Sequence, residues 1–302
     1  MPAVRVPAFA KVNLRLEVLG RRPDGYHELR TIFQSISLHD DIVFRAASRP
    51  GIELAIRGNL ELESEPVEHN LVYRAVEALR RALRIRSGVR LELIKRIPAG
   101  RGLGGGSSDA AAGLIGYLRF AGRTLPAERL VEIAASLGAD VPFFLFGGRA
   151  LGIGRGNEIY PLPDIPRRAV LVVSPQGISV PTADAYRWLR ARRVTLTKPA
   201  ADPKLWRFCA LCWSSLGGSL SNDFEAAVFG RHPRLAAIKR VLLRGGAMEA
   251  ALAGSGSAVF GLFQYPAQAR RAALGFSNEQ TFVCETLSRE RYRRALKLAR
   301  SS

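Results

Sequence analysis

Apolar and polar side chains alternate along the N-terminal part of the chain. Within residues 3–19 the apolar positions fall on every second residue, as at Val12, Leu14, Leu16 and Val18, which is the pattern of a strand. Further strands are predicted over 29–35, 41–57 and 89–93. Apolar residues at helical spacing predict helices over 70–83 and 124–137.

The glycine-rich stretch Pro98–Ala112 organises the rest of the chain. It holds five glycines between Gly100 and Gly106, after the strand predicted over 89–93 and before a run of helix formers that begins at Ala110. Glycine lets a backbone reach positive φ and approach another group closely. A helix start presents unpaired N–H groups and the positive end of the helix dipole. The stretch therefore predicts an anion site, and phosphate is the usual occupant.

Other phosphate-binding loops fit this stretch less well. The spacing Gly100-x-Gly102-x-x-Gly105 matches a dinucleotide fingerprint, but the predicted order of strand, helix and helix lacks the second strand of a Rossmann unit. The Gly-Lys-Ser/Thr of a Walker A loop and the protein kinase signatures are absent from the chain. Ser107 and Ser108 are expected near the N-cap, where they would cap the helix or hold a phosphate or metal-bound water. A glycine-rich connector without a ligand stays open as an alternative.

Three polar residues elsewhere are candidates for chemistry. Lys11 and Asn13 lie just inside a predicted strand and face the same way, although a lysine in that place is usually solvated. Asp140 precedes Val141 and Pro142, and this pattern predicts a helix N-cap with proline in the first turn. From the local pattern alone, capping is the favoured role for Asp140.

Prolines punctuate the middle of the chain. Three of them fall between Pro161 and Pro166, which predicts a domain boundary and two domains over 1–162 and 163–302. A strand is predicted directly after them, over 169–174. The length of 302 residues suits one large domain or two ordinary ones.

Charge is the unusual feature of the composition. The formal net charge is +19, whereas 47% hydrophobic and 24% charged residues are typical of a globular chain. A basic field of this size could attract nucleic acid or a polyphosphate substrate. No aromatic-interleaved RNA-binding signature accompanies it. The basic residues over 289–297 have helical spacing, which favours a solvated helix face.

Cysteines and apolar runs give little sign of other functions. The chain has three cysteines, Cys209, Cys212 and Cys284. An odd and small number of cysteines in a chain of this length argues against a disulfide framework. A zinc site needs a second Cys pair, so buried structural thiols are favoured. No run of eighteen or more apolar residues and no signal-peptide layout appear, and we expect a cytoplasmic location without membrane contact.

Residues 98–108 closely resemble the central motif of the GHMP kinases, Pro-x-x-x-Gly-Leu-Gly-x-Gly/Ser-Ser-Ser. In that family the motif wraps the ATP phosphates with backbone amides. The resemblance therefore implies that ATP is bound by Pro98, Ala99, Gly100, Arg101, Gly102, Leu103, Gly104, Gly105, Gly106, Ser107 and Ser108. Arg101 stands where the family usually has alanine.

Two catalytic residues follow from the same resemblance. The string around Lys11 and Asn13 is similar to the first GHMP motif, with Phe9 in place of its proline. The Gly-x-Asp-Val-Pro-Phe-Phe string that contains Asp140 matches the segment in which the family's catalytic base lies. Leu252-Ala-Gly-Ser-Gly-Ser257 resembles the third motif, which packs against the phosphate loop, although from its pattern alone it could be only a tight hairpin turn.

A further segment narrows the family. Residues 20–29 and the strings after them resemble the 4-diphosphocytidyl-2-C-methyl-D-erythritol kinases of the non-mevalonate isoprenoid pathway. The resemblance implies that Tyr26 stacks on the cytosine ring and His27 hydrogen-bonds its edge. Thr182 and Tyr186 match a segment that lines the substrate pocket, where the family more often has phenylalanine at the second position. Asn13 is expected among the substrate-binding residues.

The resemblance implies an α+β fold and a reaction. An N-terminal domain of ribosomal-protein-like topology and a C-terminal ferredoxin-like domain would enclose the site between them. Asp140 would deprotonate the 2-hydroxyl of the substrate and Lys11 would keep Asp140 ionised, because a cation favours the charged form of a nearby carboxylate. ATP and Mg²⁺ are expected, with the metal ligands and the oligomeric state left open.

Two alternatives remain, of which the second belongs to a different class of protein. The first is another small-molecule GHMP kinase, of the homoserine or mevalonate type, and the segment with Tyr26 and His27 argues against it. The second is a non-catalytic RNA-binding protein that uses the positive charge. Tight RNA binding with a steep salt dependence and no ATP turnover would favour this second alternative.

Overall fold

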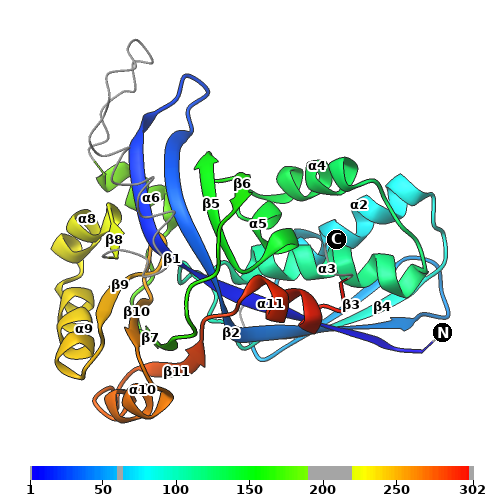
Figure 1. Ribbon diagram of the computed structural model, residues 1–302. Coiled ribbons are helices and arrows are strands. Elements are labelled where there is room, and N and C mark those ends of the chain that lie inside the picture. The colour runs from blue at the N-terminus through cyan, green and yellow to red at the C-terminus, as the bar shows by residue number, and fades with distance from the viewer. Residues whose placement is uncertain (1, 60–63, 190–219, 299–302) are drawn as a thin grey trace.

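The computed structural model describes residues 2–59, 64–189 and 220–298, and it contains two β-sheets with helices packed on them (Figure 1). This mixture confirms the α+β class. Cys209 and Cys212 of the lone Cys-x-x-Cys pair lie outside the described residues. Cys284 is half-buried, and burial raises the pKa of its thiol to about 12, which agrees with a structural role.

The larger sheet is built on one long hairpin. Strand β1 (Val4–Arg21) pairs antiparallel with β2 (His27–Ala46), which confirms strands in both segments. Strand β2 is longer than predicted, because it runs without a break from the strand predicted over 29–35 into the first part of that predicted over 41–57. The strand order is β3-β4-β2-β1-β8, and β5 adds to β2 and β6 to β5. The remaining strands are β3 (Ile52–Arg57), β4 (Val89–Ile94), β5 (Arg149–Gly154), β6 (Glu158–Pro161) and β8 (Ser221–Asn222).

Helices cover one face of this sheet. Helix α2 begins after Asn70, whose side chain accepts a hydrogen bond from the amide of Val72, and its buried residues have the helical spacing that the sequence predicts. Helix α3 is the most buried of the group, because its alanines and glycines let it lie close to β1 and α2. The group comprises η1 (Val67–His69), α2 (Leu71–Leu83), α3 (Gly105–Ala121), α4 (Ala127–Leu137) and α5 (Val141–Phe146).

The smaller sheet has the strand order β11-β7-β10-β9, all antiparallel, which is the ferredoxin-like order expected for the C-terminal domain. Its strands are β7 (Ala169–Ser174), β9 (Glu249–Leu252), β10 (Val259–Phe263) and β11 (Gln280–Glu285). The helices of this half are α6 (Thr182–Trp188), α8 (Phe224–Arg231), α9 (Pro233–Arg244) and α10 (Pro266–Ala273).

The two halves share a core. Strand β7 is buried on both faces: Leu171 belongs to the cluster under the C-terminal helices, whereas Val170 and Val172 pack in a cluster with β1 and β2. Helix α11 (Arg289–Ala295) returns to the N-terminal half, where Tyr292 donates a hydrogen bond to the Phe144 carbonyl at 2.6 Å (Figure 1). The proposed boundary near residue 162 stays a prediction, and the chain crosses it again at β8 and at α11.

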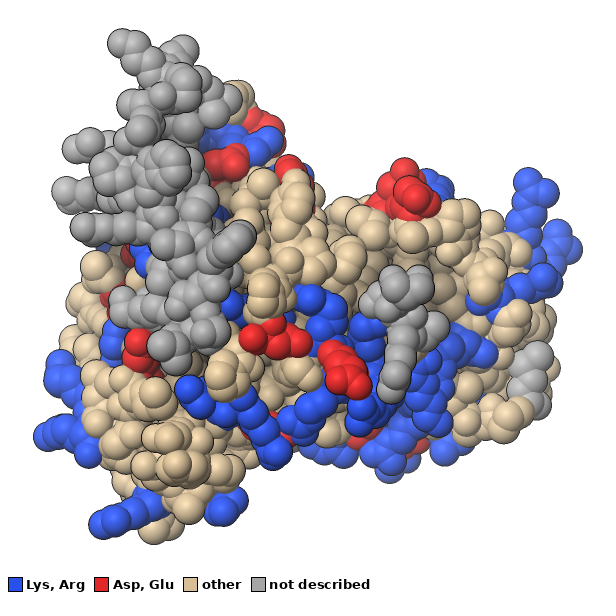
Figure 2. Space-filling model, viewed as in Figure 1, with Lys and Arg blue, Asp and Glu red and all other residues tan. Residues whose placement is uncertain are grey.

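Basic side chains gather on one face, over the region of α11 and β2 (Figure 2). Several of them form ion pairs: Arg291 and Arg167 both reach Glu285, and Arg294 reaches Glu290. Such pairs fit the solvated helix face predicted for the C-terminal run, and exposed pairs of this kind contribute little to stability. Among the described residues, no helix is both long enough and apolar enough to cross a membrane.

Candidate active site

A cavity of about 520 Å³ lies where the glycine-rich loop meets both halves of the chain. Residues from β1, the loop after β4, the start of α5, helix α6 and the turn between β9 and β10 line it. Of the residues predicted to act, the following line the cavity: Lys11, Asn13, Pro98, Ala99, Gly100, Arg101, Gly102, Leu103, Gly104, Gly105, Gly106, Ser107, Asp140, Thr182 and Tyr186. Ser108, Tyr26 and His27 do not.

The loop needs glycine at particular positions. Gly100, Gly102 and Gly104 have φ of +64°, +77° and +71°, which side chains rarely adopt. At Gly102 a Cβ atom would lie 1.9 Å from the Ala253 carbonyl oxygen, so the loop and the β9–β10 turn could not approach. Residues 100–106 of the loop and the start of α3 line the cavity, which is where an anion site needs its backbone donors.

Helix α3 begins earlier than the sequence predicts. Its N-cap is Gly104, so Ser107 and Ser108 lie inside the first turn and the prediction of a serine cap is wrong. Gly104 can occupy the left-handed conformation that starts the helix here, which a serine would do only with strain. Successive helical residues point about 100° apart. Ser107 accordingly faces the cavity, whereas the buried Ser108 hydroxyl donates to the Phe9 carbonyl at 2.7 Å and is not available to a phosphate or metal-bound water.

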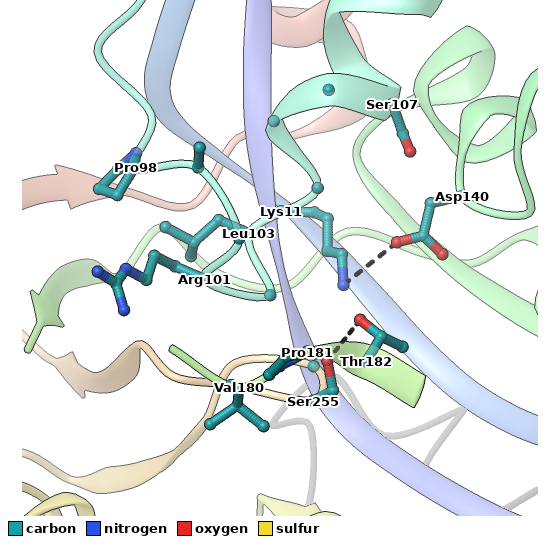
Figure 3. Close-up of a pocket in the computed structure, with 18 of the residues that line it drawn as sticks. Lys11, Pro98, Arg101, Leu103, Ser107, Asp140, Val180, Pro181, Thr182 and Ser255 are labelled. Carbon is teal, nitrogen blue, oxygen red and sulfur yellow. Dashed lines mark hydrogen bonds and ion pairs between the residues drawn. The ribbon is translucent and has the colours of Figure 1, made fainter. Parts of the chain in front are cut away.

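Lys11 is held in place by a chain of polar contacts on β1 and β2. Its Nζ donates to Asn13 Oδ1 at 2.9 Å, and Asn13 Nδ2 donates to the Thr31 hydroxyl at 2.8 Å. The Lys11 backbone amide donates to the Leu103 carbonyl at 3.0 Å, which couples the strand to the glycine loop. The side chain is 5% exposed, so its ammonium is directed into the cavity rather than into bulk solvent (Figure 3).

Asp140 occupies the N-cap position of α5, with Pro142 in the first turn as predicted. Its side chain makes no capping hydrogen bond, so the capping role favoured by the local pattern is wrong. The carboxylate instead faces Lys11, with Oδ2 3.5 Å from Nζ, and it is 33% exposed to the cavity (Figure 3). An accessible carboxylate beside a buried ammonium suits a group that accepts a proton from a ligand.

The turn between β9 and β10 packs on the glycine loop, as the third motif predicts. The Ala258 amide donates to the Arg101 carbonyl at 3.2 Å, and Arg101 Nη1 donates to the Ser257 hydroxyl at 2.7 Å. This contact turns the Arg101 side chain away from Lys11 and Asp140 (Figure 3). Asn222 on β8 donates to the carbonyls of Leu252 and Gly254, which places the turn.

The residues predicted for the cytidine are arranged differently from the expectation, since Thr182 and Tyr186 line the cavity and Tyr26 and His27 do not. The His27 ring stacks on the Tyr186 ring, with centroids 4.4 Å apart and planes 19° apart. Tyr26 is half-exposed, and the Arg155 guanidinium lies over its ring at 3.5 Å. Thr182 contacts Ser255, with the two hydroxyl oxygens 3.0 Å apart (Figure 3). Tyr186 therefore connects His27 to the cavity lining, and the role of Tyr26 stays a prediction.

We expect His27 to be neutral at pH 7. Burial lowers the pKa of its imidazole below the usual 6.5, and the Arg21 charge lowers it further. The folded state disfavours protonation, so the stability contributed by neutral His27 is present above pH 6.5 and is lost as the pH falls through lower values. An NMR titration of the imidazole should give a midpoint below 6.5, and Arg21→Gln should raise it. A midpoint at or above 6.5 would contradict this environment.

The sequence did not identify the residues at the other end of the cavity. Glu65, His69, Asn70, Lys95 and Asp109 line it there. Asn70 carries a local signal only for a helix cap, and Asp109 lies in a helix that the sequence predicts without its orientation. Because these residues are distant in the chain, only the fold brings them together.

Comparisons with known proteins identify the class. The family model of the GHMP kinases N terminal domain matches residues 70–148, and that of the GHMP kinases C terminal matches residues 206–280. A solved homoserine kinase from Cytophaga hutchinsonii shares the fold, with a TM-score of 0.67 at 21% identity over 95% of both chains. The chain belongs to the GHMP kinases.

Closer relatives show to which family within the GHMP kinases the chain belongs. A 4-diphosphocytidyl-2-C-methyl-D-erythritol kinase from Solibacter usitatus is 49% identical over 293 residues, which cover 95% of this chain and 89% of that protein. A crystal structure of a 4-(cytidine 5'-diphospho)-2C-methyl-D-erythritol kinase superposes with a TM-score of 0.76 at 35% identity, covering 93% of this chain and 98% of the other. Within the GHMP kinases, the chain belongs to this family, and not to the homoserine or mevalonate type.

Proposed function

We propose that this chain transfers the γ-phosphoryl group of ATP to the 2-hydroxyl of 4-diphosphocytidyl-2-C-methyl-D-erythritol, in the non-mevalonate isoprenoid pathway. The observation that carries the proposal is the Asp140 carboxylate, which leaves its helix uncapped and faces Lys11 in the same cavity as the glycine loop. The relatives that carry this activity in their names support the choice of substrate.

The transfer step follows from this placement. The substrate oxygen forms a bond to the γ-phosphorus, the bond from that phosphorus to the β–γ bridging oxygen breaks, and ADP leaves. Asp140 takes the proton of the hydroxyl as the bond forms. Lys11 lies 3.5 Å from Asp140, and its positive charge stabilises the negative charge on the transferring group.

The loop and helix α3 would hold the nucleotide phosphates. Backbone amides of residues 100–106 and the α3 N-terminus supply donors and a positive dipole end at a fixed place. Positioning of this kind dominates phosphoryl transfer, because the enzyme needs to do little covalent chemistry. The fixed chain from Lys11 through Asn13 to Thr31 serves the same purpose for the ammonium.

Mg²⁺ is part of the proposal. The described residues contain no group of three or more His, Cys, Asp or Glu that could hold a metal ion alone. Mg²⁺ commonly binds through one or two protein oxygens plus phosphates and water, so this cavity fits it. The Ser107 hydroxyl faces the cavity and is the protein oxygen that would hold it beside the nucleotide phosphates, and the ion would neutralise phosphate charge when bound. The cytoplasmic location stays a prediction.

The double variant Tyr26→Ala/His27→Ala tests the substrate. We expect it to lower kcat/KM for the cytidylated substrate by about 100-fold or more, since base stacking contributes roughly 1–3 kcal/mol per base and edge recognition is lost as well. The affinity for MgADP should stay unchanged, because neither residue lines the phosphate end of the cavity. Steady-state kinetics and calorimetric titration with MgADP measure the two effects.

Tyr160→Ala is the matched control, because Tyr160 is as exposed as Tyr26 and is not among the residues predicted to bind the substrate. We expect normal kinetics from it. Unchanged kcat/KM in the double variant would show that Tyr26 and His27 do not bind cytidine. The substrate would then be another small alcohol.

A further inference from the structure

A buried charge cluster lies beneath the glycine loop and plays no part in the chemistry above. Lys95 Nζ donates to Asp109 Oδ2 at 2.6 Å and also to Asp40 Oδ2, and the three side chains are 4%, 4% and 0% exposed. Long charged side chains are almost never buried to this extent unless they are paired. The cluster contains two carboxylates and one ammonium, and a buried group of this kind is not expected to be a net source of stability, because the cost of desolvating the charges can exceed their attraction.

The three residues come from elements on both sides of the loop. Asp40 lies on β2, and its Oδ1 accepts hydrogen bonds from the backbone amides of Arg96 and Ile97, where β4 leads into the loop. Asp109 lies on α3, into which the loop leads. Lys95 therefore links the start of the loop to its end, with β2 as the fixed support.

We propose that Lys95 is a positioning residue for phosphoryl transfer: it holds the two ends of loop 98–104 at the separation at which the loop amides fit the nucleotide phosphates. The proposal rests on the proposed kinase function. Lys95 Nζ lies 3.5 Å from where a Cβ on Gly105 would be, so the ammonium also lies directly behind the first residue of α3. Lys95 lines the cavity as well, but its ammonium is held by the carboxylates of Asp40 and Asp109, so in this proposal it acts by fixing the loop and not by contact with the reacting atoms.

The cluster has one more carboxylate than it has ammonium groups, so it should tolerate the loss of a negative charge better than the loss of its positive charge. Burial raises the pKa of Asp109 to about 7, with the nearby Asp40 charge adding to this and Lys95 opposing it. Asp109 Oδ1 is buried, and it has no hydrogen-bond partner among the described residues. A neutral side chain of the same shape at 109 keeps the contact from Lys95, whereas loss of Lys95 leaves two buried carboxylates without their cation.

The test compares Lys95→Met and Asp109→Asn in the full chain. We expect Lys95→Met to lower kcat/KM for ATP by roughly 100-fold, because a misplacement of about 1 Å costs about that much in rate, and to raise the Kd for MgADP in the same direction. The KM for the cytidylated substrate should change less than about twofold, since Lys95 does not touch that end of the cavity. Asp109→Asn should leave both KM values within about threefold of the wild type.

Lys95→Met could fail to fold, because unpaired buried carboxylates are strongly destabilising. The triple variant Asp40→Asn/Lys95→Met/Asp109→Leu removes all three charges and keeps an oxygen at 40 for the backbone amides, so it should fold while the link between the loop ends is lost. We expect the same loss of nucleotide affinity. Arg96→Met is the control, because its 2.6 Å ion pair with Asp41 joins the same two strands without reaching α3.

The outcomes separate the two proposals. Selective loss of ATP and MgADP affinity in the Lys95 variants, with Arg96→Met normal, supports the positioning role. Wild-type affinity for MgADP in the folded triple variant overturns it, as does an equal loss for both substrates, which would indicate a purely structural role. A wild-type protein that binds no MgADP overturns the proposed function itself and this inference with it.

Discussion

Asp140→Asn is expected to lower kcat by roughly 10²–10⁴-fold, which is the usual contribution of a positioned general base. Asparagine keeps the shape of the side chain and can still contact Lys11, but it cannot accept the proton of the hydroxyl. The Kd for MgADP should change little, because the loop amides and the start of α3 are untouched. Rapid-quench measurement of a single turnover reports the chemical step directly.

Asp223→Asn serves as the matched control for this variant. Asp223 is also the N-cap residue of a helix, α8, without a side-chain capping bond, but it does not line the cavity. Its carboxylate accepts from the Val18 amide at 2.8 Å, a bond that an asparagine oxygen can keep. Activity close to the wild type in Asp140→Asn would show that another group takes the proton.

Gly102→Ala is the second change with a large expected effect. A Cβ at this position would lie 1.9 Å from the Ala253 carbonyl oxygen, so the loop must move away from the β9–β10 turn. We expect kcat/KM for ATP to fall by about 100-fold, with a rise in KM, because the phosphate-binding amides move with the loop. Calorimetric titration with MgADP should show a parallel loss of affinity.

Gly100→Ala separates steric contact from backbone strain. Gly100 has a similar positive φ of +64°, but a Cβ there would meet nothing within 4 Å. Left-handed backbone costs an ordinary residue about 1–2 kcal/mol, so Gly100→Ala should lower the melting temperature modestly and leave the KM for ATP within a few-fold. Equal kinetic effects at the two positions would refute close packing of the loop on the turn as the reason for Gly102.

Local patterns predict much of this fold. The alternation at Val12, Leu14 and Leu16 indicates a strand because these side chains pack in apolar clusters. The polar residues that alternate with them, Lys11 and Asn13, line the cavity. The helix over Leu71–Leu83 follows from apolar spacing and from the capping Asn70. The glycine loop could be placed between strand and helix because glycine in such number is costly without a backbone reason.

What the sequence could not predict depends on contacts between distant segments. The predicted serine N-cap is wrong because Gly104 adopts a left-handed conformation and starts α3 itself. The preference of serine for N-cap positions does not reveal this earlier start. The local sequence leaves the role of Asp140 open between capping and catalysis. The fold brings Lys11, from the N-terminal strand, within 3.5 Å of its carboxylate, and this contact favours catalysis. Lys95 and Asp40 are 55 residues apart, and no local pattern indicates that they meet.

ATP turnover by the purified protein, with 4-diphosphocytidyl-2-C-methyl-D-erythritol and the same molecule without its cytidine as paired acceptors, tests the central claim most directly. We predict turnover only with the cytidylated acceptor, and this result requires both the phosphate loop and the pocket around Tyr186, Tyr26 and His27. Equal turnover of both acceptors would contradict the cytidine pocket. Turnover of neither would contradict the kinase activity itself.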